Sequence, residues 1–203
     1  YRTTFNLQEL CTDECLWAWQ TDTDIPQITN IDWTASSPRV QWTFQRLAFD
    51  VTLCNFYLTN TEVNADDPNY NLFRADVRFQ RALHLWNFLD LWGKAPFKTT
   101  YDIYELPVEK AGKDLYDWID QELTDIEPQL AEVGEFNNSA NFGRADKGAA
   151  YMLHARLALN SEVYTKGAVK DYQKAIDYCN LLDGKYELSK AEKNGYTGYE
   201  QVF

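Results

Sequence analysis

The stretch from Asn71 to Trp92 restricts the possible folds more than any other part of this sequence. Its apolar residues occupy two adjacent faces of an α-helix, so the helix is apolar nearly all the way round. Such a helix is expected to lie at the centre of a fold, where other elements cover both faces. Gly93 then supplies a left-handed helix stop, and Pro96 prevents continuation. The two faces are formed by Phe79, Ala82, Leu83, Trp86 and Leu89, and by Leu85, Phe88, Leu91 and Trp92.

Four other stretches have the apolar spacing of helices, and no stretch shows sustained strand alternation. The predicted helices span residues 39–60, 112–130, 144–161 and 169–182, whereas 64–71, 93–107 and 134–143 have the composition of loops. Small residues are frequent in 144–161, which allows a neighbouring helix to approach closely. The pattern predicts an all-α or mostly α fold, built of antiparallel helix pairs that stack like tetratricopeptide repeats.

The composition excludes two classes of protein. The 203 residues have a formal net charge of −12, and the 19 basic residues are scattered, so we expect no nucleic-acid partner. No stretch approaches the roughly 20 apolar residues of a membrane span. Aromatic residues make up 15% of the chain, enough to supply both a core and an aromatic surface.

Residues 9–19, ELCTDECLWAW, concentrate cysteines, acids and tryptophans in one segment. A metal site, a redox pair, a catalytic acid cluster and an aromatic ligand surface are the alternatives. Cys11 and Cys15 are four residues apart, which matches neither the CxxC redox motif nor paired zinc knuckles. The other two cysteines, Cys54 and Cys179, fall on apolar helical stripes. We therefore interpret the cysteines as buried structural thiols.

Acidic residues and known motifs give little support for an enzyme. Asp13 and Glu14 are adjacent and point in different directions, and acids beside a helix start usually cap it or complement its dipole. The segments 21–24 and 64–69 are acidic like calcium loops but lack the glycine and the distal glutamate. No glycine-rich phosphate loop, GxSxG or HExxH is present. We expect no catalysis, no bound metal and no cofactor.

The remaining candidate is aromatic. Trp17, Trp19 and Trp33 fall in a polar, proline-containing segment and join no helical stripe. A pyranose has an apolar C–H face and a hydroxyl rim, which an indole bordered by polar side chains suits well. The alternative is that these rings cover the helical core.

Three long motifs, in order along the chain, resemble the SusD/RagB family of outer-membrane glycan-binding lipoproteins. Residues 6–33 are similar to the family's segment built on an L-x-T-D-E core. Residues 74–97, RADVRFQRALHLWNFLDLWGKAPF, resemble its E-x-R-F-x-R-A signature, with Asp76 in place of the usual glutamate. Residues 143–165 and 171–188 resemble the signature and helix that follow.

The resemblance implies one SusD-like helical domain over residues 1–203, with tetratricopeptide-like helix pairs. Family members are more than twice this long, so we expect a fragment that lacks the lipid-anchor N-terminus and the C-terminal half. The implied function is capture of a polysaccharide or oligosaccharide at the surface of the Gram-negative outer membrane. The implied partner is a SusC-like TonB-dependent transporter, and membrane attachment would come only through a lipid anchor absent from this chain.

Carried over residue by residue, the resemblance points to Asp13 and Glu14 at the core motif and to Trp33 after it. Asp32 and Ser36 are neighbours able to supply hydrogen bonds, and Trp19 is a further ring for stacking. A tetratricopeptide-type scaffold that binds proteins and no sugar, and a glycan hydrolase, remain as alternatives. Binding to a polysaccharide panel with analysis of products separates the three.

Overall fold

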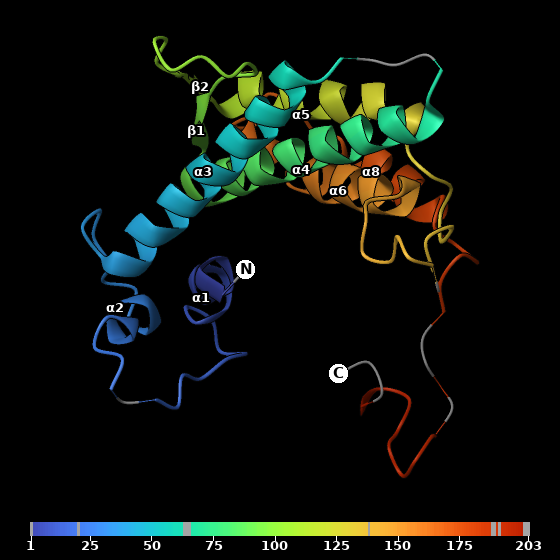
Figure 1. Cartoon of the computed structure of the whole chain (residues 1–203). Coiled ribbons are helices and arrows are strands. Elements are labelled where there is room, and N and C mark those ends of the chain that lie inside the picture. The colour runs from blue at the N-terminus through green and yellow to red at the C-terminus, as the bar shows by residue number, and fades with distance from the viewer. Residues whose placement is uncertain are drawn as a thin grey trace.

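The predicted central helix is the centre of the observed fold. A computed structural model describes residues 2–19, 21–62, 66–137, 139–187, 190 and 192–200. In it, α4 (Pro68–Trp92) packs against α3 (Pro38–Asn60) on one side and α5 (Gly112–Ile126) on the other. Figure 1 shows these helices as one layer, with α6 (Lys147–Leu159) and α8 (Tyr172–Asn180) beside each other next to it. The mostly α fold is confirmed.

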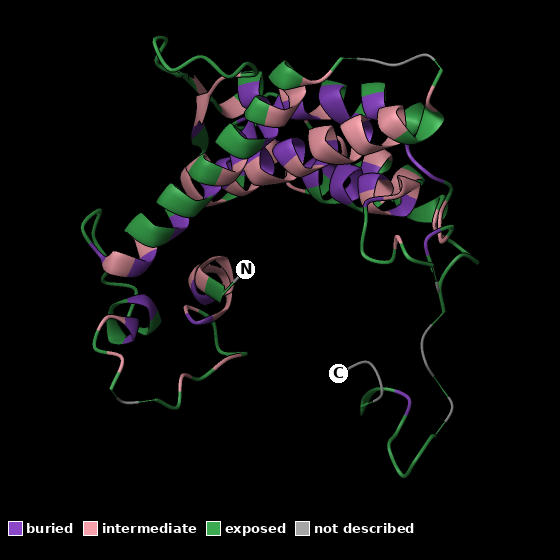
Figure 2. Cartoon of the chain, viewed as in Figure 1, coloured by how far each residue is buried: buried purple, intermediate pink, exposed green. Residues whose placement is uncertain are grey.

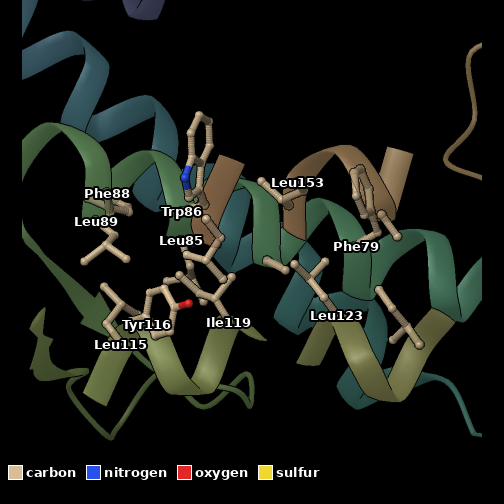
Figure 3. Close-up of a cluster of buried hydrophobic side chains, with 14 of the residues drawn as sticks. Phe79, Leu85, Trp86, Phe88, Leu89, Leu115, Tyr116, Ile119, Leu123 and Leu153 are labelled. Carbon is tan, nitrogen blue, oxygen red and sulfur yellow. The ribbon is translucent and has the colours of Figure 1, made fainter. Parts of the chain in front are cut away.

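The core of this bundle is formed chiefly by α4 and α5. Phe88, Leu85 and Leu89 of α4 meet Leu115 and Ile119 of α5, and each is at most 1% exposed (Figure 3). Burying a side chain of this size contributes about 1.5–3 kcal/mol. Both predicted apolar faces of α4 therefore contribute to the core, Leu89 from the first face and Leu85 and Phe88 from the second, and the Phe88 ring also meets that of Phe44 of α3 edge to face.

Helix ends follow local signals, some of which lengthen or shorten the predicted ranges. Asp67 caps α4, because its side chain accepts hydrogen bonds from the backbone N–H groups of Asn69 and Tyr70, so the helix begins at Pro68 and not at 71. Gly93 ends it in the left-handed conformation, as predicted. Asp146 caps α6 in the same way through the N–H of Ala149.

The other boundaries also differ by a few residues. The helix predicted at 112–130 is α5 followed by a 3-10 turn η1 (Glu127–Gln129), because Pro128 cannot continue an α-helix. The helix predicted at 144–161 is α6, and a separate short helix α7 (Ser161–Tyr164) follows it. The helix predicted at 169–182 is shorter, since α8 spans Tyr172–Asn180.

Two strands that were not predicted flank the loop, β1 (Lys94–Phe97) within the predicted 93–107 segment and β2 (Val108–Ala111) directly after it. β1 pairs antiparallel with β2, with Lys94 opposite Ala111. Four-residue strands are too short to show alternation in the sequence, and Pro96 argued against a strand. The pair is held in place because Gly93 turns the chain back and Ala95 is buried against the bundle.

The apolar spacing in 39–60 predicts one stripe with Trp42, Leu47 and Val51, and the spacing in 169–182 predicts one with Ala175 and Cys179. The structure differs from both stripes. Thr43 of α3 is fully buried, whereas Trp42 is 49% exposed, because the buried face runs through Thr43, Leu47 and Val51. On α8, Ala175 is buried but Cys179 is exposed, so the interpretation of Cys179 as a buried thiol is wrong. Cys54 is buried, and burial raises the pKa of its thiol to about 11.

Two short helices precede the bundle. These are α1 (Arg2–Glu9) and α2 (Ile25–Thr29), and we call residues 2–37 the N-terminal module. Figure 1 shows α3 projecting from the bundle toward this module, and α1 packs against α3. Within the part of the chain that the structure describes, no helix has the length and apolarity needed to cross a membrane.

Candidate functional site

The N-terminal module has a small hydrophobic cluster of its own. Leu10, Ile25 and Ile28 are at most 3% exposed, and Cys11 and Cys15 are partly buried against them. Figure 2 shows this small buried centre surrounded by exposed loops. The two cysteines therefore act as packing groups, and among the described residues no group of three or more His, Cys, Asp or Glu is arranged to hold a metal ion.

The first loop of the module presents an exposed indole. Trp17 is partly buried against the small cluster, and its ring meets that of Trp19 edge to face, with 5.8 Å between the ring centroids. Trp19 itself is 66% exposed. Arg2 of α1 lies over the Trp17 ring, with its guanidinium carbon 5.5 Å from the ring centroid. Trp17 thus anchors the loop, and the Trp19 ring is available to a ligand.

The two acids of the core motif lie earlier in the same loop. Asp13 and Glu14 are both exposed. The backbone N–H of Glu14 donates to Oγ1 of Thr12 at 3.2 Å, and Thr12 Oγ1 in turn donates to the carbonyl of Glu9 at 2.7 Å. These bonds form a turn at the end of α1 and leave both carboxylates directed at solvent, where they can accept hydrogen bonds from a hydroxylated ligand.

The second loop of the module carries the other predicted residues. Asp32 and Ser36 are exposed, and Ser36 Oγ lies 2.9 Å from Thr34 Oγ1. The loop is fixed by Ser37, whose hydroxyl donates to Oε1 of Gln27 at 2.7 Å, and by Ile31, which has a positive φ of 57°. The predicted polar residues are therefore accessible, on a loop with defined backbone.

Trp33 has features of both alternatives, a ring that covers the core and a ring exposed to a ligand. Its ring lines a small cavity of about 70 Å³ together with Leu7, Ile28, Val40, Leu91 and Trp92, yet the residue remains 43% exposed. One part of the indole therefore borders the apolar junction between the module and the C-terminal end of α4, and the other part faces solvent. Trp19, not Trp33, is the more accessible of the two predicted rings.

The predicted residues thus form two groups. Asp13, Glu14 and Trp19 lie on the loop that precedes α2, and Asp32, Trp33 and Ser36 lie on the loop that follows it. The small cluster around Ile25 and Ile28 holds both loops to the same module.

A larger hollow lies elsewhere and was not predicted. It has a volume of about 740 Å³ at the end of α4, and Tyr164 donates there from its hydroxyl to Oδ1 of Asp90 at 2.6 Å. Burial, with the hydrogen bond to Asp90, raises the pKa of Tyr164. The lining comes from α4, both strands, α5 and α7, so no sequence spacing could indicate it. The lining residues include Trp92, Lys94, Glu109, Lys113, Asn160 and Lys166.

Comparison with known proteins finds relatives of this chain. The chain is 48% identical over its whole length to the starch-binding protein SusD of Bacteroides thetaiotaomicron, and 27% identical over 55% of its length to the SusD-like protein P25 of Formosa agariphila. The chain spans 34% of the length of the first relative and 21% of the second. No protein-family model matches the chain.

Solved structures give the same fold. The surface glycan-binding protein A from Bacteroides uniformis superposes with a TM-score of 0.71 at 17% identity, over 95% of this chain and 42% of that one. A laminarin-binding SusD-like protein gives a TM-score of 0.67 at 17% identity, over 85% of this chain and 35% of that one. Identity of 48% over the whole of this chain, together with the shared helical fold, identifies the chain, over the stretch that it spans, as a member of the SusD family.

Proposed function

We propose that this chain is the helical part of a cell-surface protein that binds a polysaccharide or oligosaccharide without cleaving it. The observation that carries the proposal is the exposed indole of Trp19, held by Trp17 on a loop that also bears Asp13 and Glu14. An accessible apolar ring bordered by hydrogen-bond acceptors suits a sugar, which has both an apolar face and hydroxyl groups. The 48% identity to a starch-binding protein makes starch the first ligand to test.

The wider arrangement belongs to the same proposal. Residues 1–203, some of which lie outside the described ranges, would belong to one helical domain of a longer lipoprotein at the surface of the outer membrane. The bound glycan would be delivered to a SusC-like TonB-dependent transporter. The second loop, with Asp32, Trp33 and Ser36, would contact sugar units next to the one stacked on Trp19. Co-purification of the full-length protein with the transporter barrel, from membranes, tests the partner.

The binding experiment uses the full-length protein and calorimetric titration with soluble starch, with laminarin as a second polysaccharide. Stacking that removes tens of Å² of apolar area is worth on the order of 1–2 kcal/mol, so Trp19→Ala should weaken starch binding about ten-fold. Tyr104→Ala is the matched control, because Tyr104 is 91% exposed on the loop between β1 and β2. The starch recovered after binding should have its original chain length. Equal affinity in wild type and Trp19→Ala would contradict this site.

A scaffold that binds proteins is the second candidate, and one observation favours it. Trp42, Phe49, Leu53 and Phe56 recur along one face of α3 and are each 49–52% exposed. A face with this spacing fits a partner helix. Under this alternative neither polysaccharide would bind, so the same titration decides between the two functions.

A further inference from the structure

Arg39 is a buried cation that joins the bundle to the loop carrying Trp19. It is the second residue of α3, and its side chain is 8% exposed. Its Nε donates to Oδ2 of Asp24 at 2.5 Å, and its Nη2 lies 3.5 Å from Oδ1 of the same carboxylate and 3.6 Å from Oδ2 of Asp22. One guanidinium therefore bridges two acids that are separated from it by 15 and 17 residues in the sequence.

Asp22 connects this ion cluster to Trp19. The backbone N–H of Asp22 donates to the carbonyl of Trp19 at 3.4 Å, and its own carbonyl accepts from the N–H of Ile25 at 3.2 Å. The turn after Trp19 is thereby hydrogen-bonded to the start of α2. Arg2 approaches the Asp22 carboxylate from the other side, at 3.7 Å, while it also lies over Trp17.

The position of the Trp19 ring thus depends on contacts at both ends of its loop. Trp17 fixes the side that precedes it, and the carboxylates held by Arg39 fix the side that follows. A binding group held in its bound geometry avoids the entropy cost of being ordered when the ligand arrives. A lysine could not replace Arg39 fully, because an ammonium group lacks the planar fork that contacts two carboxylates at once.

We propose that Arg39 is a positioning residue for sugar binding, which acts by holding Asp22 and Asp24 so that the Trp19 ring is presented to the ligand. Arg39 does not itself touch the sugar. This inference rests on the proposed function, since it assigns a role within the same binding site. It predicts that the loss of Arg39 reduces affinity only through Trp19.

The first measurement is the affinity of the full-length protein for soluble starch. Arg39→Ala should weaken binding about five-fold or more, and Arg39→Lys should give a smaller loss in the same direction. Arg46→Ala is the matched control, because Arg46 lies on the same helix but pairs with Asp50 at 3.9 Å and has a side chain that is 62% exposed. The control should bind starch like wild type.

The second measurement separates positioning from a general structural role. In a protein that already carries Trp19→Ala, adding Arg39→Ala should change starch affinity by less than about two-fold, because the ring that Arg39 positions is gone. The proposal would be overturned if Arg39→Ala reduced starch affinity as much in the Trp19→Ala protein as it does in wild type. It would also be overturned if both Arg39 variants bound starch with wild-type affinity. If Arg39→Ala does not fold, Arg39→Lys alone and with Trp19→Ala gives the same comparison.

Failure of the inference can be told apart from failure of the proposed function. If wild type binds starch, Trp19→Ala does not, and the Arg39 variants bind like wild type, the site stands and the role of Arg39 is wrong. If wild type binds neither polysaccharide, the glycan-binding function itself is wrong, and the proposal for Arg39 falls with it.

Discussion

Glu122 offers the most direct test of how the bundle is held together. Its carboxylate, with the side chain 8% exposed, receives hydrogen bonds from Arg78 Nη2 at 2.7 Å and from Arg81 Nη2 at 2.8 Å. These contacts join α5 to α4 at the centre of the fold. Arg81 is itself buried, and it also donates to Oδ1 of Asn55 and to the carbonyl of Thr99, each at 3.0 Å.

Replacing Glu122 with glutamine should reduce the free energy of unfolding by about 3–5 kcal/mol. Glutamine has nearly the same volume, so no cavity forms, but the buried charge of Arg81 loses its counter-charge. Asp125→Asn is the matched control, because Asp125 pairs with the same Arg78 at 3.8 Å but is 50% exposed. Exposed pairs of this kind contribute at most about 1 kcal/mol.

The assay is urea denaturation at pH 7, with linear extrapolation of the free energy of unfolding to water. We expect a large loss for Glu122→Gln and a loss below about 1 kcal/mol for Asp125→Asn. If the two variants lost the same small amount, the cluster would contribute no more than a surface ion pair. The reasoning from burial would then be refuted.

Three further predictions concern stability. Burial disfavours the Glu122 carboxylate, but the hydrogen bonds and charges of Arg78 and Arg81 outweigh this and lower its pKa from 4.5. The stability that Glu122 contributes should therefore be present above about pH 4.5 and be lost as pH falls through the lowered pKa. As the pH is lowered, the free energy of unfolding should decrease less steeply in Glu122→Gln than in wild type. Phe88→Ala should reduce the free energy of unfolding, measured by urea denaturation, by about 3–5 kcal/mol. Phe44→Ala should reduce it by less than half of that, because the Phe44 ring, whose centroid lies 5.1 Å from that of Phe88, is 39% exposed. Trp33→Ala should lower stability by about 1–2 kcal/mol, because part of its ring lies against the apolar junction; an unchanged melting temperature would show that the ring is not packed there.

The sequence by itself determined the helices whose pattern is long and strongly periodic. The two apolar faces of α4 require burial on both sides wherever the helix lies, and Gly93 ends it for a local reason, since only a residue without a Cβ adopts its φ of 69° at little cost. The family motifs are also properties of the sequence, and the 48% identity to SusD agrees with them. Local propensity and burial pattern act within a few residues, which is why a sequence can reveal them.

Short or weakly periodic elements escaped the same reasoning. The strands β1 and β2 depend on each other for their hydrogen bonds, so neither is recognisable alone. The helices α1 and α2 have 8 and 5 residues, too few to be stable without the contacts that bury Leu10, Ile25 and Ile28. Cys179 lies on the same apolar stripe as the buried Ala175 but is itself exposed, and only the way in which α8 packs against α6 decides that.

The candidate site shows the same division. The sequence identified the loops with Trp19 and Trp33, because tryptophans in a polar segment belong to no helical stripe. It could not rank them, since the exposure of each ring depends on whether Trp92 and Leu91, some 60 residues away, lie beneath it. Nor could it pair Arg39 with Asp22 and Asp24, because attraction between charges depends on their distance in space and not on their separation along the chain. The tertiary structure alone brings these groups together.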